Sequence, residues 1–170
     1  SSSAEEHDEI VKKMGAFDNL IENLYTLASS GGAIELRTVL MKKNITSLPL
    51  LAKFIANNCQ FIAFWAIMGL EPIGYAKSFR DELFFDHSQF FTPIKNAIEI
   101  AKLHNIHVAL YNFPLCTVPK EYRESCVDSI SDWKKKYLKV CDPCVEKQNC
   151  AGFFEWYNKK WELTEVAPIK

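Results

Sequence analysis

A regular alternation of helix-type and strand-type segments is the feature that most constrains this fold. Apolar residues recur at helical spacing in three segments, 18–32, 45–58 and 91–105, and three strand-type segments, rich in β-branched and apolar residues, are 34–41, 60–74 and 106–116. Helix followed by strand, three times over, is typical of a parallel sheet layered with helices and joined by right-handed crossovers. The sequence therefore predicts an α/β fold with parallel strands.

Charge and hydropathy argue against nucleic-acid and membrane partners. The chain carries 20 basic and 21 acidic residues, so we expect no net attraction to a polyanion. The longest apolar run, Phe61–Leu70, is too short for a membrane-spanning helix, which needs roughly 20 residues, and it indicates a buried strand. We interpret the basic cluster Lys134–Lys136 as the solvated face of a helix. Because no secretory signal is visible, we expect a cytoplasmic protein.

The character of the sequence changes after Cys116. The residues beyond it hold four of the six cysteines and three of the four tryptophans, and they contain no strand-like run. We therefore expect an α/β part at 1–115 and a short helical, cysteine-rich extension at 116–170. A chain of this size has a large apolar core and does not need disulfides to fold, so a metal site is the better explanation for the crowded thiols.

The extension contains a C-x2-C-x5-C pattern made by Cys141, Cys144 and Cys150. Thiolates bind zinc or an iron–sulfur cluster, and both usually take four protein ligands. Two residues between the first pair let both sulfurs point at one centre, and the third cysteine is in reach of the same loop. Spacing alone leaves zinc, an iron–sulfur cluster, and a disulfide or redox-active thiols all open.

The fourth ligand must come from elsewhere in the chain. Cys116 follows the last predicted strand, where the ends of parallel strands collect ligands, and it is the favoured candidate. Cys126 is its competitor, although a helical reading of its segment makes it a buried thiol among Val127 and Ile130. Cys59, between a predicted helix and a predicted strand, is interpreted as a core residue.

Several segments together resemble one protein family. They are HDEIVKKMGAFDNLIENL, IELRTVLMKKN, MGLEPIGYAKS, LYNFPLC, SISDWKKKYL and CDPCVEKQNCAGFF, which span most of the chain. Their order and content look like the C-terminal half of the His-Xaa-Ser system radical SAM maturases, which modify a ribosomally made peptide. The combination of segments is far more specific than any one of them.

The resemblance implies a fold, cofactors and ligands. The fold is a partial (β/α)6 barrel that binds a [4Fe–4S] cluster and S-adenosylmethionine, and residues 1–115 become the C-terminal portion of that barrel. The extension is implied to hold an auxiliary [4Fe–4S] cluster. Its ligands on this sequence are Cys116, Cys141, Cys144 and Cys150.

Two further residues gain a role from the resemblance. Arg37, inside a predicted strand, is implied to reach the carboxylate or ribose of S-adenosylmethionine; the plainer alternative is a salt bridge to Glu35 or another surface acid. Glu71 follows a predicted strand, at the end where such barrels do their chemistry, and is implied to contact cofactor or substrate. Its plainer alternative is a turn residue that caps the next segment.

The sequence also departs from the family. It has no C-x3-C-x2-C triplet, whose thiolates hold the cluster that cleaves S-adenosylmethionine, and no glycine-rich GGEP-like segment. The first residues resemble those just after the family's fourth strand. We therefore expect this chain to be inactive alone and to work with the missing N-terminal barrel half, or with a partner radical SAM protein.

Overall fold

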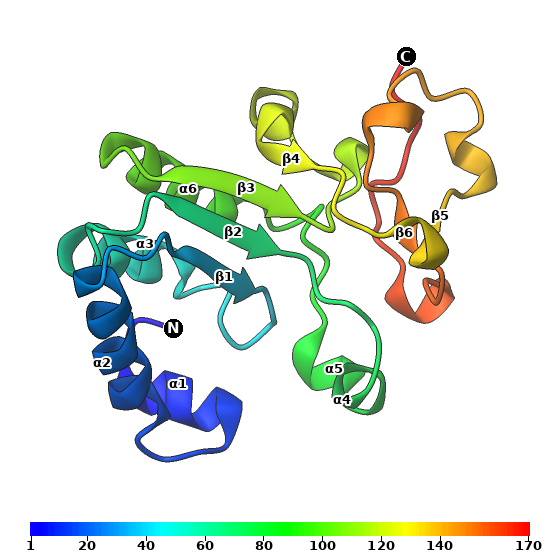
Figure 1. The fold of residues 1–170 in the computed structure, drawn as a ribbon. Coiled ribbons are helices and arrows are strands. Elements are labelled where there is room, and N and C mark those ends of the chain that lie inside the picture. Colours follow the sequence, from blue (N-terminus) through cyan, green and yellow to red (C-terminus); the bar gives the residue numbers. More distant parts are fainter.

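A four-stranded parallel sheet forms the centre of the structure, a computed structural model that describes residues 1–170. Its strands are β1 (Glu35–Val39), β2 (Phe64–Met68), β3 (His107–Tyr111) and β4 (Cys126–Val127), and they lie side by side in this order (Figure 1). The first three fall within the segments predicted as strands. The α/β class and the parallel sheet are confirmed.

Helices connect the strands. The three predicted helices are α2 (Ala16–Ser29), α3 (Leu48–Asn58) and α6 (Thr92–Leu103), each somewhat shorter than its apolar pattern. Three shorter ones, α1 (Ala4–Val11), α4 (Tyr75–Ser78) and α5 (Arg80–Leu83), have no counterpart in the prediction. None of them combines the length and apolar character that a membrane span requires.

One face of the sheet forms the main core with α3 and α6. The side chains of Trp65 and Ile67 on β2, and of Val108 and Leu110 on β3, point to this face and are almost completely buried. Leu36 of β1 packs against them from the edge of the sheet. Because both crossover helices lie behind the sheet in Figure 1, this face is closed to solvent.

The opposite face carries an arginine that crosses the sheet. Arg37, Ala66 and Ala109 are register partners on β1, β2 and β3. Because both partners are small, the Arg37 side chain extends across them, and its guanidinium carbon lies 5.8 Å from the ring centre of Tyr111. No helix lies in front of this face in Figure 1.

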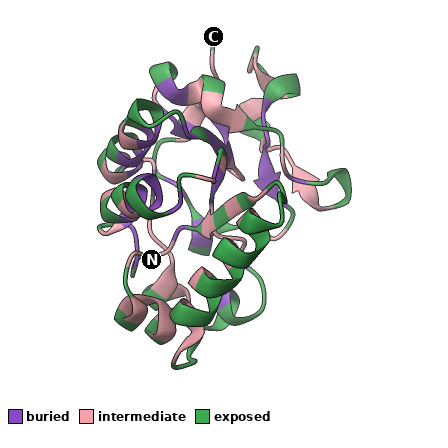
Figure 2. Cartoon of the chain, turned by 60° about the vertical axis from the view of Figure 1, so that its left-hand side comes forward, coloured by how far each residue is buried: buried purple, intermediate pink, exposed green.

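The first two helices form a hairpin with no buried residue, mainly exposed or intermediate in Figure 2. The carboxylate of Asp8 on α1 accepts hydrogen bonds from the backbone N–H groups of Gly15 and Phe17, at 2.5 and 2.9 Å. It thereby caps the start of α2, where Gly15 has no side chain to do so. The Tyr25 hydroxyl joins this hairpin to α3 through the carbonyl of Asn58.

The extension differs from the predicted short helical segment. It has no α-helix; its helices are 3-10 turns, namely η1 (Leu115–Thr117), η2 (Lys120–Ser125), η3 (Asp132–Lys134), η4 (Lys139–Cys141), η5 (Lys147–Asn149) and η6 (Lys159–Trp161). Between them, β5 (Lys135–Lys136) pairs with β6 (Phe153–Phe154) in a separate antiparallel ribbon.

The helical reading of the segment around Cys126 is also wrong. Cys126 and Val127 form β4 and pair with Leu110 and Tyr111 of β3. The reason is tertiary: the outer side of β3 offers unpaired backbone groups, and two extended residues satisfy part of them. The extension therefore completes the main sheet.

Candidate functional site

Four cysteines line one small cavity beyond the carboxyl end of β3. They are Cys116, Cys141, Cys144 and Cys150, and the cavity measures about 20 Å³. Cys150 is buried and the other three are half-buried. The structure thus brings together the four residues that the resemblance implies as cluster ligands. Two distant stretches of the chain supply them.

Local backbone structure places each thiol. Pro114 ends the extended run after β3, and the 3-10 turn η1 that follows presents Cys116. The turn η4 ends at Cys141, and the N–H of Cys144 donates to the carbonyl of Cys141 at 3.1 Å, so both thiols come from one tight turn. Cys150 follows η5 in an extended conformation.

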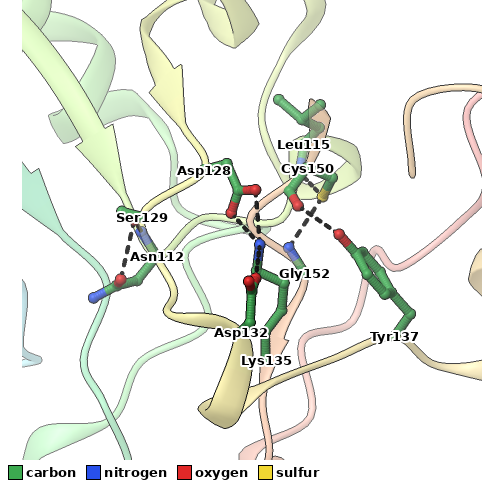
Figure 3. A network of polar contacts seen from close by, with 9 residues as sticks. All are labelled: Asn112, Leu115, Asp128, Ser129, Asp132, Lys135, Tyr137, Cys150 and Gly152. Atoms are coloured by element: carbon green, nitrogen blue, oxygen red, sulfur yellow. Dashed lines mark hydrogen bonds and ion pairs between the residues drawn. The ribbon is translucent and has the colours of Figure 1, made fainter. Parts of the chain in front are cut away.

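Backbone N–H groups are directed at the sulfur of Cys150 (Figure 3). Leu115 and Gly152 donate to its Sγ, at 3.3 and 3.4 Å, and the hydroxyl of Tyr137 donates to its carbonyl oxygen at 3.0 Å. Hydrogen bonds of this kind orient a ligating sulfur and tune the metal that it holds. They give Cys150 a fixed position in the cavity wall.

The backbone conformation and close packing at position 152 require a glycine. Its φ is +65°, and an added Cβ would lie 2.9 Å from the carbonyl oxygen of Lys136 on the neighbouring strand. Any other residue would strain the backbone and push β5 away from β6. The glycine therefore allows both the close strand pairing and the N–H···S bond to Cys150.

The electrostatic environment keeps two of the thiols protonated at neutral pH. Burial raises the pKa of Cys116, against a backbone hydrogen bond from Ala167 that lowers it. Burial also raises the pKa of Cys150, against the N–H groups of Leu115 and Gly152. A bound cation reverses this balance, because a coordinating thiol loses its proton.

The donor set fits a thiolate site, yet the sulfurs are not closed around one ion. No group of three or more His, Cys, Asp or Glu side chains in the structure has an arrangement that holds a metal ion. Four thiolates on one zinc lie about 3.8 Å apart, since each Zn–S bond is about 2.3 Å. The cysteine cavity therefore has the right number and type of donors without a preformed tetrahedral site.

The other two cysteines lie outside this cavity. Cys126 is on β4, and burial raises the pKa of its thiol to about 12. Since Cys116 lines the cavity and Cys126 does not, the geometry favours Cys116 as the fourth ligand. Cys59 caps the end of α3 and is buried in the main core, so its interpretation as a core residue is confirmed.

Arg37 and Glu71 lie apart from the cysteine cavity, and each has a partner. The Nε of Arg37 is 2.8 Å from a carboxylate oxygen of Glu35, the alternative that the sequence left open. Glu71 follows β2 and lies 3.1 Å from the ammonium of Lys134, which comes from the extension. Glu71 thus ties the main sheet to the extension.

The lysines of the extension do not form the solvated helix face that we expected. The side chain of Lys135 is only 11% exposed, and its ammonium lies 2.6 Å from a carboxylate oxygen of Asp128 and 3.7 Å from one of Asp132 (Figure 3). Three consecutive lysines suggested an exposed surface. Pairing between β5 and β6 instead turns the Lys135 side chain inward, where the carboxylates of Asp128 and Asp132 neutralise its charge.

Sequence reasoning missed several parts of the cavity wall. The terminal segment 167–169 lines it, and the carbonyl of Ile169 accepts the N–H of Val145, at 3.0 Å. Tyr137 and Leu115 also went unnoticed. The glycine two residues after Cys150 was the one available signal, because glycine beside a ligand often marks a close backbone approach.

Comparison with known proteins gives no relative for this chain. No protein-family model, no curated protein and no solved structure matches it.

Proposed function

We propose that this chain binds an auxiliary [4Fe–4S] cluster and serves as the C-terminal part of a radical SAM enzyme that modifies a peptide. The observation that carries the proposal is the convergence of Cys116, Cys141, Cys144 and Cys150 on one cavity. The N–H groups directed at the Cys150 sulfur support a charged thiolate ligand there. Such a cluster would ligate substrate or pass electrons.

A cubane differs from a single ion in the spacing of thiols that it requires. Each thiolate binds a different iron of a cubane, so the four sulfurs stand farther apart than around zinc. The cavity would have to widen, since about 20 Å³ is little more than one water-sized sphere. The segment 141–149, which is built of turns and 3-10 turns rather than a packed helix, is the part of the wall that would have to move.

The main sheet supports the barrel part of the proposal. Its strands follow one another in sequence order, with α3 and α6 on the same face, as in a segment of a (β/α) barrel. Arg37 then lies on the face that would line the barrel interior, where S-adenosylmethionine binds. Glu71 has lone pairs left beside Lys134 with which to meet cofactor or substrate.

Activity in this proposal requires a partner. The cluster that cleaves S-adenosylmethionine needs a C-x3-C-x2-C triplet, which the missing barrel half or a partner radical SAM protein would supply. The outer edge of β1, which pairs only with β2, is where further strands would add. The substrate would be a ribosomally made peptide.

A structural zinc site in a non-catalytic binding module is the second candidate. The small size of the cysteine cavity favours it, because a single ion needs less room than a cubane. Zinc would then hold the extension in shape and leave the chain without redox chemistry.

Competition between the two metals tests the proposal. The chain is reduced, stripped of metal with a chelator, and offered iron with sulfide, or zinc, under anaerobic conditions. We expect about four irons and four sulfides per chain, with brown colour, to be retained through gel filtration in the presence of equimolar zinc. Retention of one zinc and loss of iron would instead establish the structural site.

A further inference from the structure

A second cavity lies where the carboxyl ends of the strands meet the extension. It measures about 60 Å³, and most of its wall is apolar or aromatic. Residues from the ends of β1, β2 and β3 face residues of the extension across it; among them are Leu40, Gly69, Phe113, Phe153, Tyr157 and Trp161. In parallel α/β folds, this end of the sheet is where ligands bind.

A buried histidine forms part of the wall. His87 is 7% exposed and packs edge-on against Phe113, with 4.6 Å between ring centres. Its Nε2 lies 2.8 Å from the hydroxyl oxygen of Thr117. That hydroxyl donates its only proton to the carbonyl of Pro114, at 2.7 Å. With its proton on the Pro114 carbonyl, the Thr117 hydroxyl accepts from His87, and we assign the ring proton to Nε2.

The other ring nitrogen is left as an acceptor. Because burial lowers the pKa of His87 to about 4, the ring is neutral at physiological pH and Nδ1 bears a lone pair. The hydrogen bond recorded for the ring is the one at Nε2. Nδ1 is not enclosed by protein atoms, since Trp156 Nε1 is the one fully buried side-chain nitrogen or oxygen without a partner. Because His87 lines the cavity, we assign this space to Nδ1.

A potential donor belongs to the same wall. The hydroxyl oxygen of Tyr157 accepts the N–H of Leu163 at 3.0 Å, which leaves the phenol proton unused. Asn112, another polar side chain in the wall, is already engaged: its amide nitrogen donates to Gly69 and its amide oxygen accepts from Ser129. The cavity thus offers an acceptor on His87 and a donor on Tyr157 in apolar surroundings.

We propose that this cavity binds the hydroxyl-bearing end of a small uncharged alcohol. The ligand O–H donates to Nδ1 of His87, and its carbon atoms lie against the aromatic wall. The size fits a short group, because a cavity of about 150 Å³ is needed for benzene and this one has less than half of that volume. Charged groups are excluded, since the wall provides no opposite charge to replace their water.

The site is distinct from the proposed cluster and does not depend on it. Pro114 and Phe153 line both cavities and separate them, while no cysteine lines this one. A result here therefore stands whether the cysteine cavity holds iron, zinc or no metal.

Two probes of equal size test the proposal. Isopropanol and acetone have four heavy atoms each, but only isopropanol has a proton to donate. The full chain is labelled with 15N on histidine, and the Nδ1 resonance of His87 is followed during titration with each probe. We expect a saturable shift with isopropanol and about tenfold weaker binding of acetone, because acetone leaves the buried acceptor unpaired. His104, which is exposed on the surface, is the internal control and should not respond saturably.

Two variants sharpen the test, in which a fluorine-labelled alcohol and a fluorine-labelled ketone compete for the cavity. His87→Phe keeps a ring and removes the lone pair, so the alcohol should lose its tenfold advantage. His87→Gln can donate to Thr117 through its amide nitrogen and present its oxygen to the cavity, so the advantage should return. No saturable response in the folded wild-type chain, or equal affinity for both probes, would overturn the proposal and leave the cavity as a site for water alone.

Discussion

The backbone N–H of Leu115 donates a hydrogen bond to the sulfur of Cys150, 3.3 Å away and 35 residues later in the chain. This bond joins the exit of the main sheet to the end of the cysteine loop. Since Cys116 is the next residue after Leu115, it also places Cys116 and Cys150 in one cavity wall. Part of the proposed ligand set is therefore held by the protein fold itself.

Replacing the proposed fourth ligand should release the cluster. In Cys116→Ser we expect iron content to fall to less than half of the wild-type value after anaerobic reconstitution, because a three-thiolate site holds a cubane poorly. Cys126→Ser is the matched control: its thiol lies outside the cavity and has a pKa raised to about 12, so iron content should not change. The reverse pattern would make Cys126 the fourth ligand.

The close approach at Gly152 should be essential for stability. Gly152→Ala adds a Cβ 2.9 Å from the Lys136 oxygen at a φ of +65°, and we expect it to lower the free energy of unfolding by about 2–4 kcal/mol. Gly31→Ala separates the two causes, because Gly31 has a similar φ of +76° and open space around it. Gly31→Ala should lower the free energy of unfolding by about 1 kcal/mol. Equal losses in urea denaturation would show that the contact with β5 is unimportant.

The ion pair between Glu71 and Lys134 should contribute to the attachment of the extension. Both side chains are largely buried, at 25% and 21% exposed, so Glu71→Gln should lower the free energy of unfolding by about 1–2 kcal/mol, between the surface and buried limits. Glu9→Gln is the control, because the Glu9 side chain is 62% exposed beside Lys43. Its effect should be below about 0.5 kcal/mol. A double-mutant cycle with Lys134→Met measures the coupling free energy of the pair. A value near zero would show that this ion pair does not help to attach the extension.

Burial of neutral His87 should make stability depend on pH. Burial lowers its pKa from 6.5 to about 4, so between these values the unfolded chain binds a proton that the folded chain does not. The free energy of unfolding should therefore be highest above pH 6.5 and fall by up to about 3 kcal/mol as the pH drops to 4. His87→Phe should flatten this part of the profile, measured by urea denaturation at each pH. An unchanged slope in the variant would assign it to other groups.

Asp86, the residue before His87, contributes to the pH dependence of stability below this window. Hydrogen bonds from Ser88 and Thr164 outweigh burial and lower the pKa of its carboxyl below 3.8. Its contribution is present above pH 3.8 and is lost as the pH falls from there through the lowered pKa, which is below the range in which His87 acts.

The strands were predictable because their apolar character is local. Trp65 and Ile67 are buried on one face, and the alanine between them is covered on the other, so β2 appears as a continuous apolar run. By contrast, β4 is two residues long and exists because β3 offers it a partner. No local sequence pattern around Cys126 predicts such a strand.

The cysteine set could be named from sequence, but its surroundings could not. Spacing indicated Cys141, Cys144 and Cys150, and the position after a strand indicated Cys116. The N–H groups of Leu115 and Gly152 belong to the backbone and have no residue signature. Lys135 was misjudged because pairing between β5 and β6, which turns it toward Asp128, depends on residues far apart in the chain.

Metal content, measured together with the visible spectrum of the chain purified without oxygen, tests the central claim most directly. The proposal predicts about four irons and four sulfides per chain, brown colour, and loss of both in Cys116→Ser but not in Cys126→Ser. One zinc per chain with no colour would contradict the cluster and leave the cysteine cavity as a structural site. A colourless chain that takes up neither metal after reduction would contradict both assignments.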